Sequence, residues 1–307
     1  MLRNIIGVAV SAFFIVLIFH MLDFRATLNH LAGIRAVYIA PFVLCHLAGL
    51  FFRSFRWGLI LRPSKPVRLG TLFPITVIGY MLSNILPLKL GEFARIFLLE
   101  QREEISKMTV AATLVLEKLV DAVLVTLIFL PIALSSPLPS WLKPVLVVAS
   151  ALIAGVSLLL LYAARADGQS FRLLRSALAG RAPRVHHFIE RTYDRFLEGL
   201  GVLKVPGLLL KVLLSSLPIF LFGGLSAYWL IKALGLGWVP FQASFATFIF
   251  IYFSALIPSA PGGVGTLEYF AILALSLYAV PKELGLSFAL SYHSLIILAL
   301  IVLGLFF

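Results

Sequence analysis

Three charged side chains lie in an otherwise apolar part of the chain, next to a proline and a glycine. The stretch Leu82–Glu104 has the sequence LSNILPLKLGEFARIFLLEQREE, which includes Lys89, Glu92 and Arg95. Lysine binds phosphate as a point charge, and arginine binds it through two parallel hydrogen bonds. We therefore expect Lys89 and Arg95 to bind a phosphate group. The alternative is that Lys89, Glu92 and Arg95 pair with one another or extend to a membrane surface.

A glycine-rich turn indicates a second place where an anion could bind. In the sequence PSAPGGVG, which begins at Pro258, the residues Gly262, Gly263 and Gly265 have no side chains to block an approaching group. The turn is expected to leave backbone N–H groups free, and Thr266 is expected to cap the helix that follows. Such a helix start attracts anions through its unpaired donors and its dipole. The alternative is a tight turn that only lets two helices pack.

Acidic side chains occur inside an apolar segment, in the sequence LEKLVDAV. Glu117 and Asp121 are four residues apart and share one helix face, and Lys118 can reach Asp121. Each charge costs about 2.5 to 3.5 kcal/mol at the centre of a membrane helix, so such charged side chains are expected to be paired or to have a function. We expect Glu117, Asp121 and the more distant Glu268 to balance the cations described above or to couple transport to protons. Purely structural pairing of these residues is the alternative.

The sequence favours neither a metal site nor a nucleotide site. His46 and His293 lie singly in apolar segments, where packing is the expected role, and His186–His187 has no Cys, Asp or Glu at metal-ligand spacing. The phosphate-binding motif G-x-x-x-x-G-K-[ST] does not occur in the sequence. We therefore expect no metal, no cofactor and no ATP-driven step.

Composition indicates an all-α membrane protein that crosses the bilayer several times. Of its 307 residues, 61% are hydrophobic and 12% are charged, and the mean hydropathy is +1.06. A soluble domain of this length could not bury so much apolar surface. We expect about six full spans and two interrupted segments. The expected spans are 4–22, 36–52, 109–133, 144–163, 208–234 and 284–307, and the interrupted segments are 71–88 and 241–280.

The distribution of basic residues predicts how the chain is oriented. The formal net charge is +12, and the Lys and Arg residues concentrate in loops 53–70 and 165–211, a pattern typical of cytoplasmic loops rather than of nucleic-acid binding. If segment 71–107 crossed fully, these loops would lie on opposite sides. It is therefore predicted to enter from the cytoplasm and return, with Arg53 and Arg56 at its cytoplasmic mouth. Both chain termini are then cytoplasmic.

The two interrupted segments resemble each other and suggest an internal repeat of opposite orientation. Ser83–Pro87 aligns with Ser254–Pro258, and the same alignment places Gly91 on Gly262. Each half has the order span, span, broken segment, span, and the two halves start on opposite sides of the membrane. We predict one transmembrane domain, 1–307, with inverted halves 1–133 and 144–307 and a basic amphipathic cytoplasmic insertion, 165–207, on the inner headgroups.

Inverted repeats of this kind place a binding site near the middle of the bilayer, where the two broken elements meet. We expect Ser83 and Asn84 of the first segment and the glycine turn of the second to form the floor and ceiling of one site. Irregular backbone at membrane depth requires surrounding protein or a water-filled cavity. The two segments should therefore enclose a sheltered chamber.

Four motifs together resemble the lysylphosphatidylglycerol synthase transmembrane family. They are R-x-x-R-W at Arg53–Trp57, S-N-x-x-P-x-x-x-G-E-x-x-R at Ser83–Arg95, E-K-x-x-D at Glu117–Asp121 and P-x-x-P-G-G-x-G-x-x-E at Pro258–Glu268. The resemblance covers nearly the whole chain. It implies movement of a lipid between membrane leaflets. The cytosolic aminoacyltransferase domain of the fused family members is absent from this sequence, so lipid synthesis is not expected.

These observations lead to the expectation of a lipid flippase rather than an enzyme. Its substrate would be a membrane phospholipid or a polyprenyl-phosphate-type lipid. This lipid would be anionic, aminoacylated or polyprenyl-linked. The second expected partner is the anionic headgroups of the inner leaflet of the cell membrane. Nucleic acid is not expected, and a homo-oligomer is left open. One alternative is an intramembrane enzyme that modifies a lipid headgroup, and another is an accessory protein in envelope lipid biogenesis that recruits a partner through loop 165–211.

Overall fold

The computed structural model describes residues 33–86, 90–135, 139–140, 142–165, 183–255 and 259–307, with Phe13, Val16, Thr27, His30, Leu31 and Ile257. All regular elements in these parts of the chain are helices, which confirms the all-α prediction. Two predicted site residues, Lys89 and Pro258, lie outside the described residues, as do most of the first expected span, 4–22, and part of the insertion at 166–182.

The helices follow one another along the chain in a single order. Their bounds are η1 Ala36–Tyr38, α3 Ile39–Leu61, α4 Leu69–Ile85, α5 Leu90–Glu103, α6 Lys107–Ser135, α7 Leu142–Arg165, α9 Pro183–Gly199, η4 Gly201–Lys204, α10 Pro206–Ala233, α11 Phe241–Ser254, η5 Pro261–Gly263, α12 Thr266–Ser276 and α13 Lys282–Phe306.

Four of the described helical segments are long and apolar enough to cross a membrane. They are Ala36–Leu61, Leu142–Arg165, Pro206–Ala233 and Lys282–Phe306, and each corresponds to a predicted span. The predicted span 109–133 falls within α6, which is 29 residues long and carries the three charged residues of LEKLVDAV. The described part of the chain is therefore that of a membrane protein with several helical spans.

The helices are interrupted in the two stretches where the sequence predicts breaks. Helix α4 ends at Ile85, and Leu86, which precedes a proline, has extended backbone with φ −94° and ψ 146°. A residue before proline is sterically disfavoured in the helical region, which explains this end. In the second stretch, Gly262, Gly263 and Gly265 have φ values of 70°, 80° and 86°. Glycine adopts this left-handed conformation without strain, so the turn needs these glycines.

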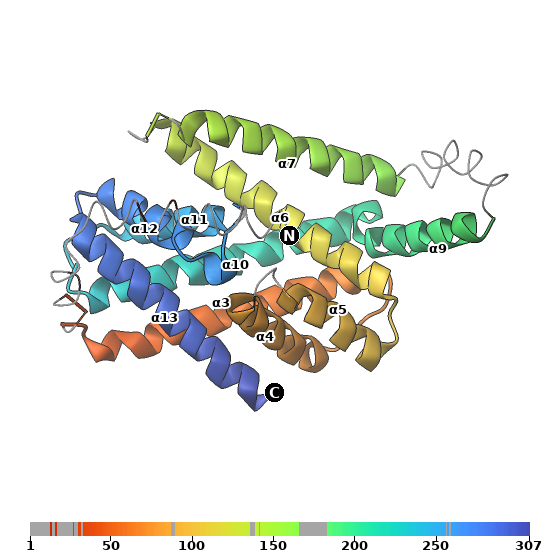
Figure 1. Cartoon of the computed structure of the whole chain (residues 1–307), viewed down its shortest axis with the longest axis horizontal. Coiled ribbons are helices and arrows are strands. Elements are labelled where there is room, and N and C mark those ends of the chain that lie inside the picture. Colours follow the sequence, from red (N-terminus) through yellow and green to blue (C-terminus); the bar gives the residue numbers. More distant parts are fainter. Residues whose placement is uncertain are drawn as a thin grey trace.

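The two pairs of short helices lie on opposite sides of the middle of the molecule (Figure 1). Helices α4 and α5 pack together toward the right of the view, and α11 and α12 pack together toward the left. The long helices α3 and α10 pack against each other between them. Helix α4 contacts α13, and α11 contacts α6. These are the cross-contacts that two related halves would exchange, although the inverted repeat itself stays a prediction.

Close approach between α4 and α5 depends on two glycines. A Cβ added to Gly91 would collide with the carbonyl oxygen of Gly79 and would lie 2.5 Å from the backbone nitrogen of Ser83. A Cβ added to Gly79 would lie 2.6 Å from Cδ of Arg95. The two helices can therefore run in direct contact only because these positions have no side chains, and this contact positions Arg95.

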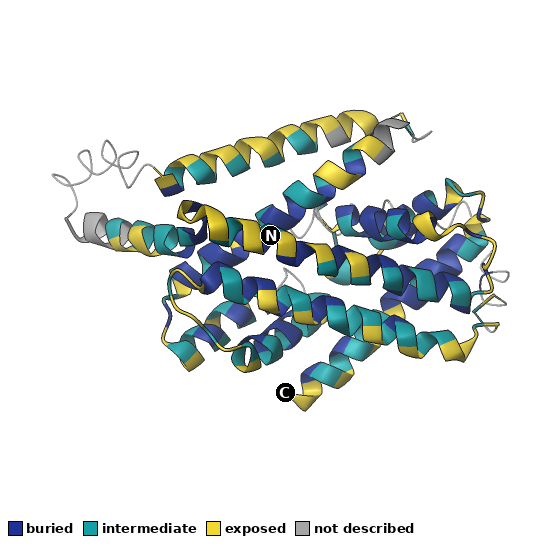
Figure 2. Cartoon of the chain, turned by 180° about the vertical axis from the view of Figure 1, so that it is seen from behind, coloured by how far each residue is buried: buried dark blue, intermediate teal, exposed yellow. Residues whose placement is uncertain are grey.

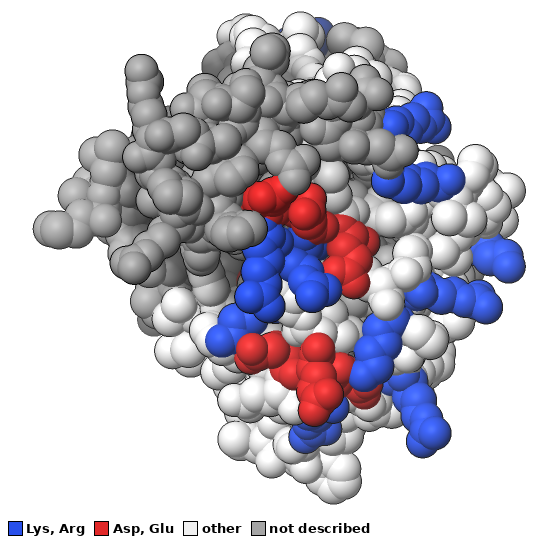
Figure 3. All heavy atoms as spheres, turned by 90° about the vertical axis from the view of Figure 1, so that its right-hand side faces the viewer, with Lys and Arg blue, Asp and Glu red and all other residues white. Residues whose placement is uncertain are grey.

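The outer surface separates an apolar region from a charged end. Helix α7 turns mostly exposed side chains outward (Figure 2), and none of its most apolar window is buried. Lys, Arg, Asp and Glu side chains gather on the end that lies at the right of Figure 1 (Figure 3). The connections 62–68 and 104–106 lie at this end. The distribution is typical of a membrane protein with one charged aqueous face.

The basic loop predicted at 53–70 is shorter than expected. Helix α3 continues to Leu61, so Arg53 and Arg56 lie inside the helix rather than at the mouth of a loop. Arg56 is fully buried. The prediction was wrong because charged residues were taken to end the span, whereas their partners on neighbouring helices allow the helix to continue.

Candidate functional site

A cavity of about 630 Å³ lies between the two broken segments. We call it the chamber. Its wall includes side chains from α3, α4, α5, α6, α10, α11 and α13 and residues of the glycine turn. Apolar residues predominate on the wall, but five charged side chains line it. They are Arg53, Glu92, Arg95, Lys118 and Asp121.

An ion pair joins α5 to α6 at the chamber. Arg95 donates two hydrogen bonds to the Glu117 carboxylate, at 2.7 Å and 3.5 Å, and both side chains are almost completely buried. The guanidinium of Arg95 lies 4.1 Å from the centre of the Trp57 ring, and the Trp57 indole donates to the hydroxyl of Thr113 at 3.1 Å. Arginine stacks well on aromatic faces, so α3 also fixes its position.

A second cluster centres on Asp121 and joins α3 to α6. Its carboxylate lies 2.6 Å from Nη1 of Arg56 and 3.3 Å from Nη1 of Arg53. Arg53 also donates to the hydroxyl of Tyr252 on α11, at 2.6 Å, and Arg56 donates to the hydroxyl of Ser216 on α10, at 3.0 Å. One acidic residue therefore helps to connect four helices around the chamber.

A third pair is more accessible. Nζ of Lys118 lies 3.4 Å from Oε1 of Glu92, with side-chain exposures of 43% and 31%. Lys118 was expected to reach Asp121, but its ion-pair partner is Glu92 on α5. Glu92 and Arg95 therefore pair with residues of α6 and not with each other, which corrects the local pairing considered from the sequence.

Positive charge exceeds negative charge by one in these three groups. Four cations face three anions, so the balance is 4 − 3 = +1. Full burial of unpaired charges would be strongly unfavourable, and pairing is what permits so many at this depth. Some donors still have no partner among the described residues. They are Nε of Arg95 and Nε and Nη2 of Arg56.

The glycine turn is organised by a carboxylate. The backbone N–H of Gly265 donates to Oε2 of Glu268 at 2.6 Å, and Oε1 of Glu268 lies 2.7 Å from Nδ1 of His293. Gly265 therefore occupies the capping position. Thr266, which was expected to cap the helix, is its first residue, and its hydroxyl donates to the carbonyl of Gly263.

Two expectations about the turn are therefore corrected. The N–H groups of Gly263 and Gly265 are not free, because the former donates to the carbonyl of Ala260 and the latter to Glu268. The side chain that contacts the Glu268 carboxylate is His293, rather than one of the cations of the first segment. Helix α12 thus already has an anion at its start, supplied by its own third residue.

Most of the predicted site residues meet at the chamber. Ser83, Asn84, Gly262 and Gly263 line it together with the charged residues named above. A Cβ on Gly262 would lie 3.4 Å from the carbonyl oxygen of Asn84, so the tips of the two broken segments are in contact. Arg56 and Glu117 lie behind the wall and hold residues that line it.

Several important residues were not singled out from the sequence. Tyr80, Tyr252 and Ser216 bind the arginines of α3, and His293 was expected only to pack. Arg53 and Tyr252 are 199 residues apart in the chain. No local spacing joins them. Trp57, which contacts Arg95, could have been found from the sequence, because it belongs to the R-x-x-R-W motif.

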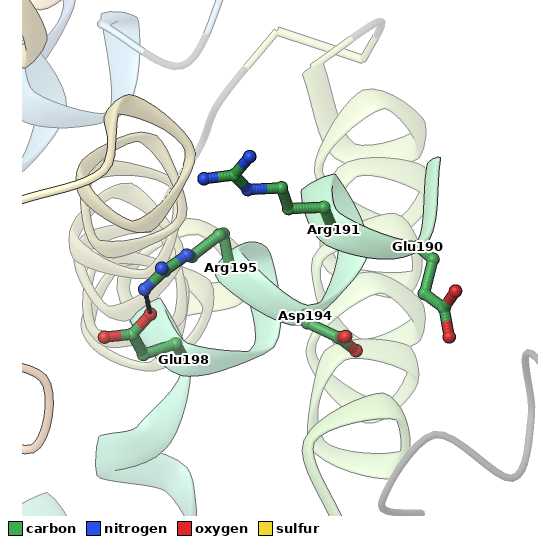
Figure 4. Close-up of a pocket in the computed structure, with 5 residues that line it drawn as sticks. All are labelled: Glu190, Arg191, Asp194, Arg195 and Glu198. Carbon is green, nitrogen blue, oxygen red and sulfur yellow. Dashed lines mark hydrogen bonds and ion pairs between the residues drawn. The ribbon is translucent and has the colours of Figure 1, made fainter. Parts of the chain in front are cut away.

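Among the described residues, no group of three His, Cys, Asp or Glu side chains could hold a metal ion. A second depression lies on the surface of α9, lined by Glu190, Arg191, Asp194, Arg195 and Glu198. Figure 4 shows that Arg195 and Glu198 turn toward each other, at 3.0 Å, along one helix. The carbonyl of Arg195 also accepts from the hydroxyl of Thr109, which holds α9 against α6.

Comparison with known proteins agrees with the motifs. No curated protein and no solved structure gives a significant match to the chain. The family described as the lysylphosphatidylglycerol synthase TM region matches residues 4–304, which is nearly the entire sequence. The chain therefore belongs to the family of the lysylphosphatidylglycerol synthase transmembrane region.

Proposed function

We propose that this protein moves a phosphate-bearing lipid between the two leaflets of the cell membrane without altering it. The observation that carries the proposal is the chamber, which combines a polar wall with the contacting tips of two broken segments. A lipid headgroup cannot cross the hydrocarbon core without polar partners. The charged side chains on the chamber wall would supply such partners.

Charged groups on the chamber wall would replace water around the headgroup. Nε of Arg95 has no partner in the part of the chain that the structure describes, and Lys118 is exposed enough to exchange its contact with Glu92 for a phosphate oxygen. Arg53, whose side chain is 13% exposed, adds a third donor. Because the cluster has an excess of one positive charge, a headgroup with a negative phosphate would find a favourable field. The acyl chains would remain in the lipid.

The broken segments provide a route for alternating access. Residues of α4, α5, α11 and α12 line the chamber. The first two helices lie on the side of the charged end, and the last two lie on the opposite side (Figure 1). We propose that both pairs are re-entrant, that the charged end and both chain termini are cytoplasmic, and that opening of one pair at a time exposes the chamber to one leaflet. Rocking of two related halves about a central site has this effect in other transporters.

Reconstitution in liposomes tests the proposal. Lipids with a fluorophore on the acyl chain and an unmodified phosphoglycerol, phosphoethanolamine or polyprenyl-phosphate headgroup would be bleached from outside by dithionite. Protein-dependent bleaching of the inner pool, with unchanged lipids by mass spectrometry, is the expected result. A chemically altered headgroup would instead support the enzyme alternative. If none of these lipids is exchanged or chemically altered, the result would support the accessory role.

A pair of double variants separates the chamber from general stability. Arg95→Met with Glu117→Leu removes a buried ion pair without stranding a charge, a replacement that is often tolerated in cores. Exchange should fall about tenfold or more, because a hydrogen bond to a charged group contributes about 1.5 to 3 kcal/mol. The control is Lys107→Met with Glu100→Leu, which removes an exposed ion pair, at 3.5 Å, between the same two helices. Equal exchange in both variants would remove Arg95 from the site.

A further inference from the structure

A carboxylate and an imidazole form a buried contact directly behind the glycine turn. Glu268 and His293 are 5% and 7% exposed, and Oε1 of Glu268 lies 2.7 Å from Nδ1 of His293. The other carboxylate oxygen accepts the N–H of Gly265. A contact this short between a carboxylate and a ring nitrogen requires one proton between them. The pair therefore already holds one proton.

The second ring nitrogen of His293 has no such partner. Nε2 is buried and has no hydrogen-bond partner among the described residues. It lies 3.0 Å from the position of a Cβ on Gly262, and the carbonyl oxygen of Asn84 lies 3.4 Å from the same position. Nε2 and this carbonyl therefore flank Gly262. Both Gly262 and Asn84 line the chamber, which places Nε2 one residue behind its wall.

The Asn84 carbonyl is a suitable acceptor. Asn84 lies in the last turn of α4, which ends at Ile85, where carbonyl groups lack partners within the helix and the helix dipole is negative. A protonated Nε2 would be drawn toward it, and a neutral Nε2, which carries a lone pair, would not. Protonation of His293 thus favours contact between α13, which carries His293, and the end of the first broken segment.

Ionisable groups on the neighbouring helices line the chamber that the pair lies behind. On the elements packed against α12 and α13, the ionisable side chains that line the chamber are His46, Cys45 and Arg53 of α3, Tyr80 of α4, Tyr252 of α11 and Tyr292 of α13 itself. Arg53 is paired with Asp121 and donates to both Tyr80 and Tyr252. No described carboxylate other than Glu268 contacts His293.

We propose that Glu268 and His293 form a proton-binding site that couples lipid movement to a pH gradient. This inference rests on the proposed function and adds the ion whose gradient drives transport. A proton from the aqueous phase reaches Nε2 through the chamber and forms an N–H bond, which converts imidazole to imidazolium beside the Glu268 carboxylate. The same proton leaves when the chamber opens to the other side. Charge and atoms balance with a proton as the only co-substrate.

The test is the leaflet distribution at equilibrium in the full-length protein. Liposomes with a pH difference of one unit, and with the membrane potential clamped by potassium and valinomycin, would be incubated with an exchanged lipid until its distribution is constant. Coupling of one proton to each lipid drives an asymmetry of about tenfold, because one pH unit corresponds to a tenfold ratio of proton activity. Without coupling, the distribution stays the same as at equal pH.

Isosteric variants identify the site. Glu268→Gln keeps an oxygen for the Gly265 N–H, and His293→Gln keeps a donor for Glu268, but neither amide titrates. Both variants should lose the asymmetry, whereas Glu100→Gln, on the exposed part of α5, should keep it. An equilibrium ratio does not depend on the rate, so a merely structural role of the pair would slow exchange and leave the asymmetry intact. Asymmetry that persists in both variants would overturn the assignment.

Failure of the inference is distinguishable from failure of the proposed function. Exchange without asymmetry in the unmodified protein would overturn proton coupling and leave translocation in place, and absence of exchange would overturn both. A second measurement does not need transport. In nitrogen-15 histidine NMR spectra recorded as a pH series, a signal that His293→Gln removes should report binding of a second proton to the ring. A His293 signal that shows no such change at any pH at which the protein stays folded would also contradict the proposal.

Discussion

At the scale of single residues, the charges around the chamber form pairs across helices. Arg56 and Glu117 are completely buried, and each contacts an opposite charge at 2.6 Å or 2.7 Å. Such pairs often contribute little net stability, because desolvation offsets the attraction. Loss of one partner is different, since it leaves a buried charge without compensation. The pairs therefore determine which arrangement of the helices is tolerated.

Asp121→Asn is the sharpest test of this view. The substitution leaves Arg56 fully buried without an opposite charge, so we expect the free energy of unfolding to fall by about 3 to 5 kcal/mol. Denaturant unfolding in mild detergent measures it. Glu198→Gln, which removes the exposed pair with Arg195, should change stability by less than about 1 kcal/mol. If both substitutions change stability by similarly small amounts, other groups must compensate the buried charge of Arg56.

At the scale of the elements, the pairing of short helices depends on backbone contact. Helices α4 and α5 touch at Gly79 and Gly91, and the Arg95 side chain packs over the former. This close contact lets α5 present Arg95 and Glu92 to α6. The geometry of the chamber is thus a consequence of two positions that lack side chains.

Gly91→Ala should therefore separate α4 from α5. The added methyl group meets backbone atoms, which cannot turn away as a side chain could. We expect a loss of about 1 to 3 kcal/mol of stability, the usual cost of overpacking, together with reduced exchange. Gly70→Ala is the matched control, since its Cβ has nothing within 4 Å. Thermal unfolding followed by size-exclusion chromatography compares the two. Unchanged stability in Gly91→Ala would mean that α4 and α5 can move apart without lowering the free energy of unfolding.

At the scale of the whole molecule, charged side chains gather at one end of the fold. The charged end includes the connections 62–68 and 104–106, and the short helices α11 and α12 lie toward the other end (Figures 1 and 3). Because a basic loop lies at the charged end, we propose from the positive-inside rule that this end is cytoplasmic. We also propose, from the repeat in the sequence, that the two broken segments enter from opposite sides.

Cysteine labelling tests this orientation directly. In a Cys45→Ala background, Gly70→Cys should react with an impermeant maleimide only from the cytoplasmic side, and Lys282→Cys only from the external side. Both positions are exposed. The paired experiment in intact cells and in inverted vesicles measures the side. Reaction of both cysteines from the same side would exclude a scheme in which the broken segments enter from opposite faces.

Much of the fold follows from local chemistry. Long apolar runs, a proline that ends α4 near Ile85 and glycines that permit positive φ at 262, 263 and 265 are visible in the sequence, and the helices and breaks lie where these features predict. The set of charged residues around the chamber was also identified, because charges in apolar segments are costly and therefore conspicuous. Helix ends were less accurate, as the continuation of α3 to Leu61 shows.

Partners across the chamber were accessible only from the packed helices. Arg53 meets Asp121 across 68 positions of sequence and Tyr252 across 199, and Arg56 meets Ser216 across 160. Spacing along one helix suggested that Lys118 contacts Asp121, whereas it pairs with Glu92. The sequence also suggested that Glu268 balances the cations of the first segment, whereas it contacts His293. Composition and periodicity are properties of neighbouring residues, whereas ion pairs depend on which faces of distant helices pack together, and that is set by the whole core.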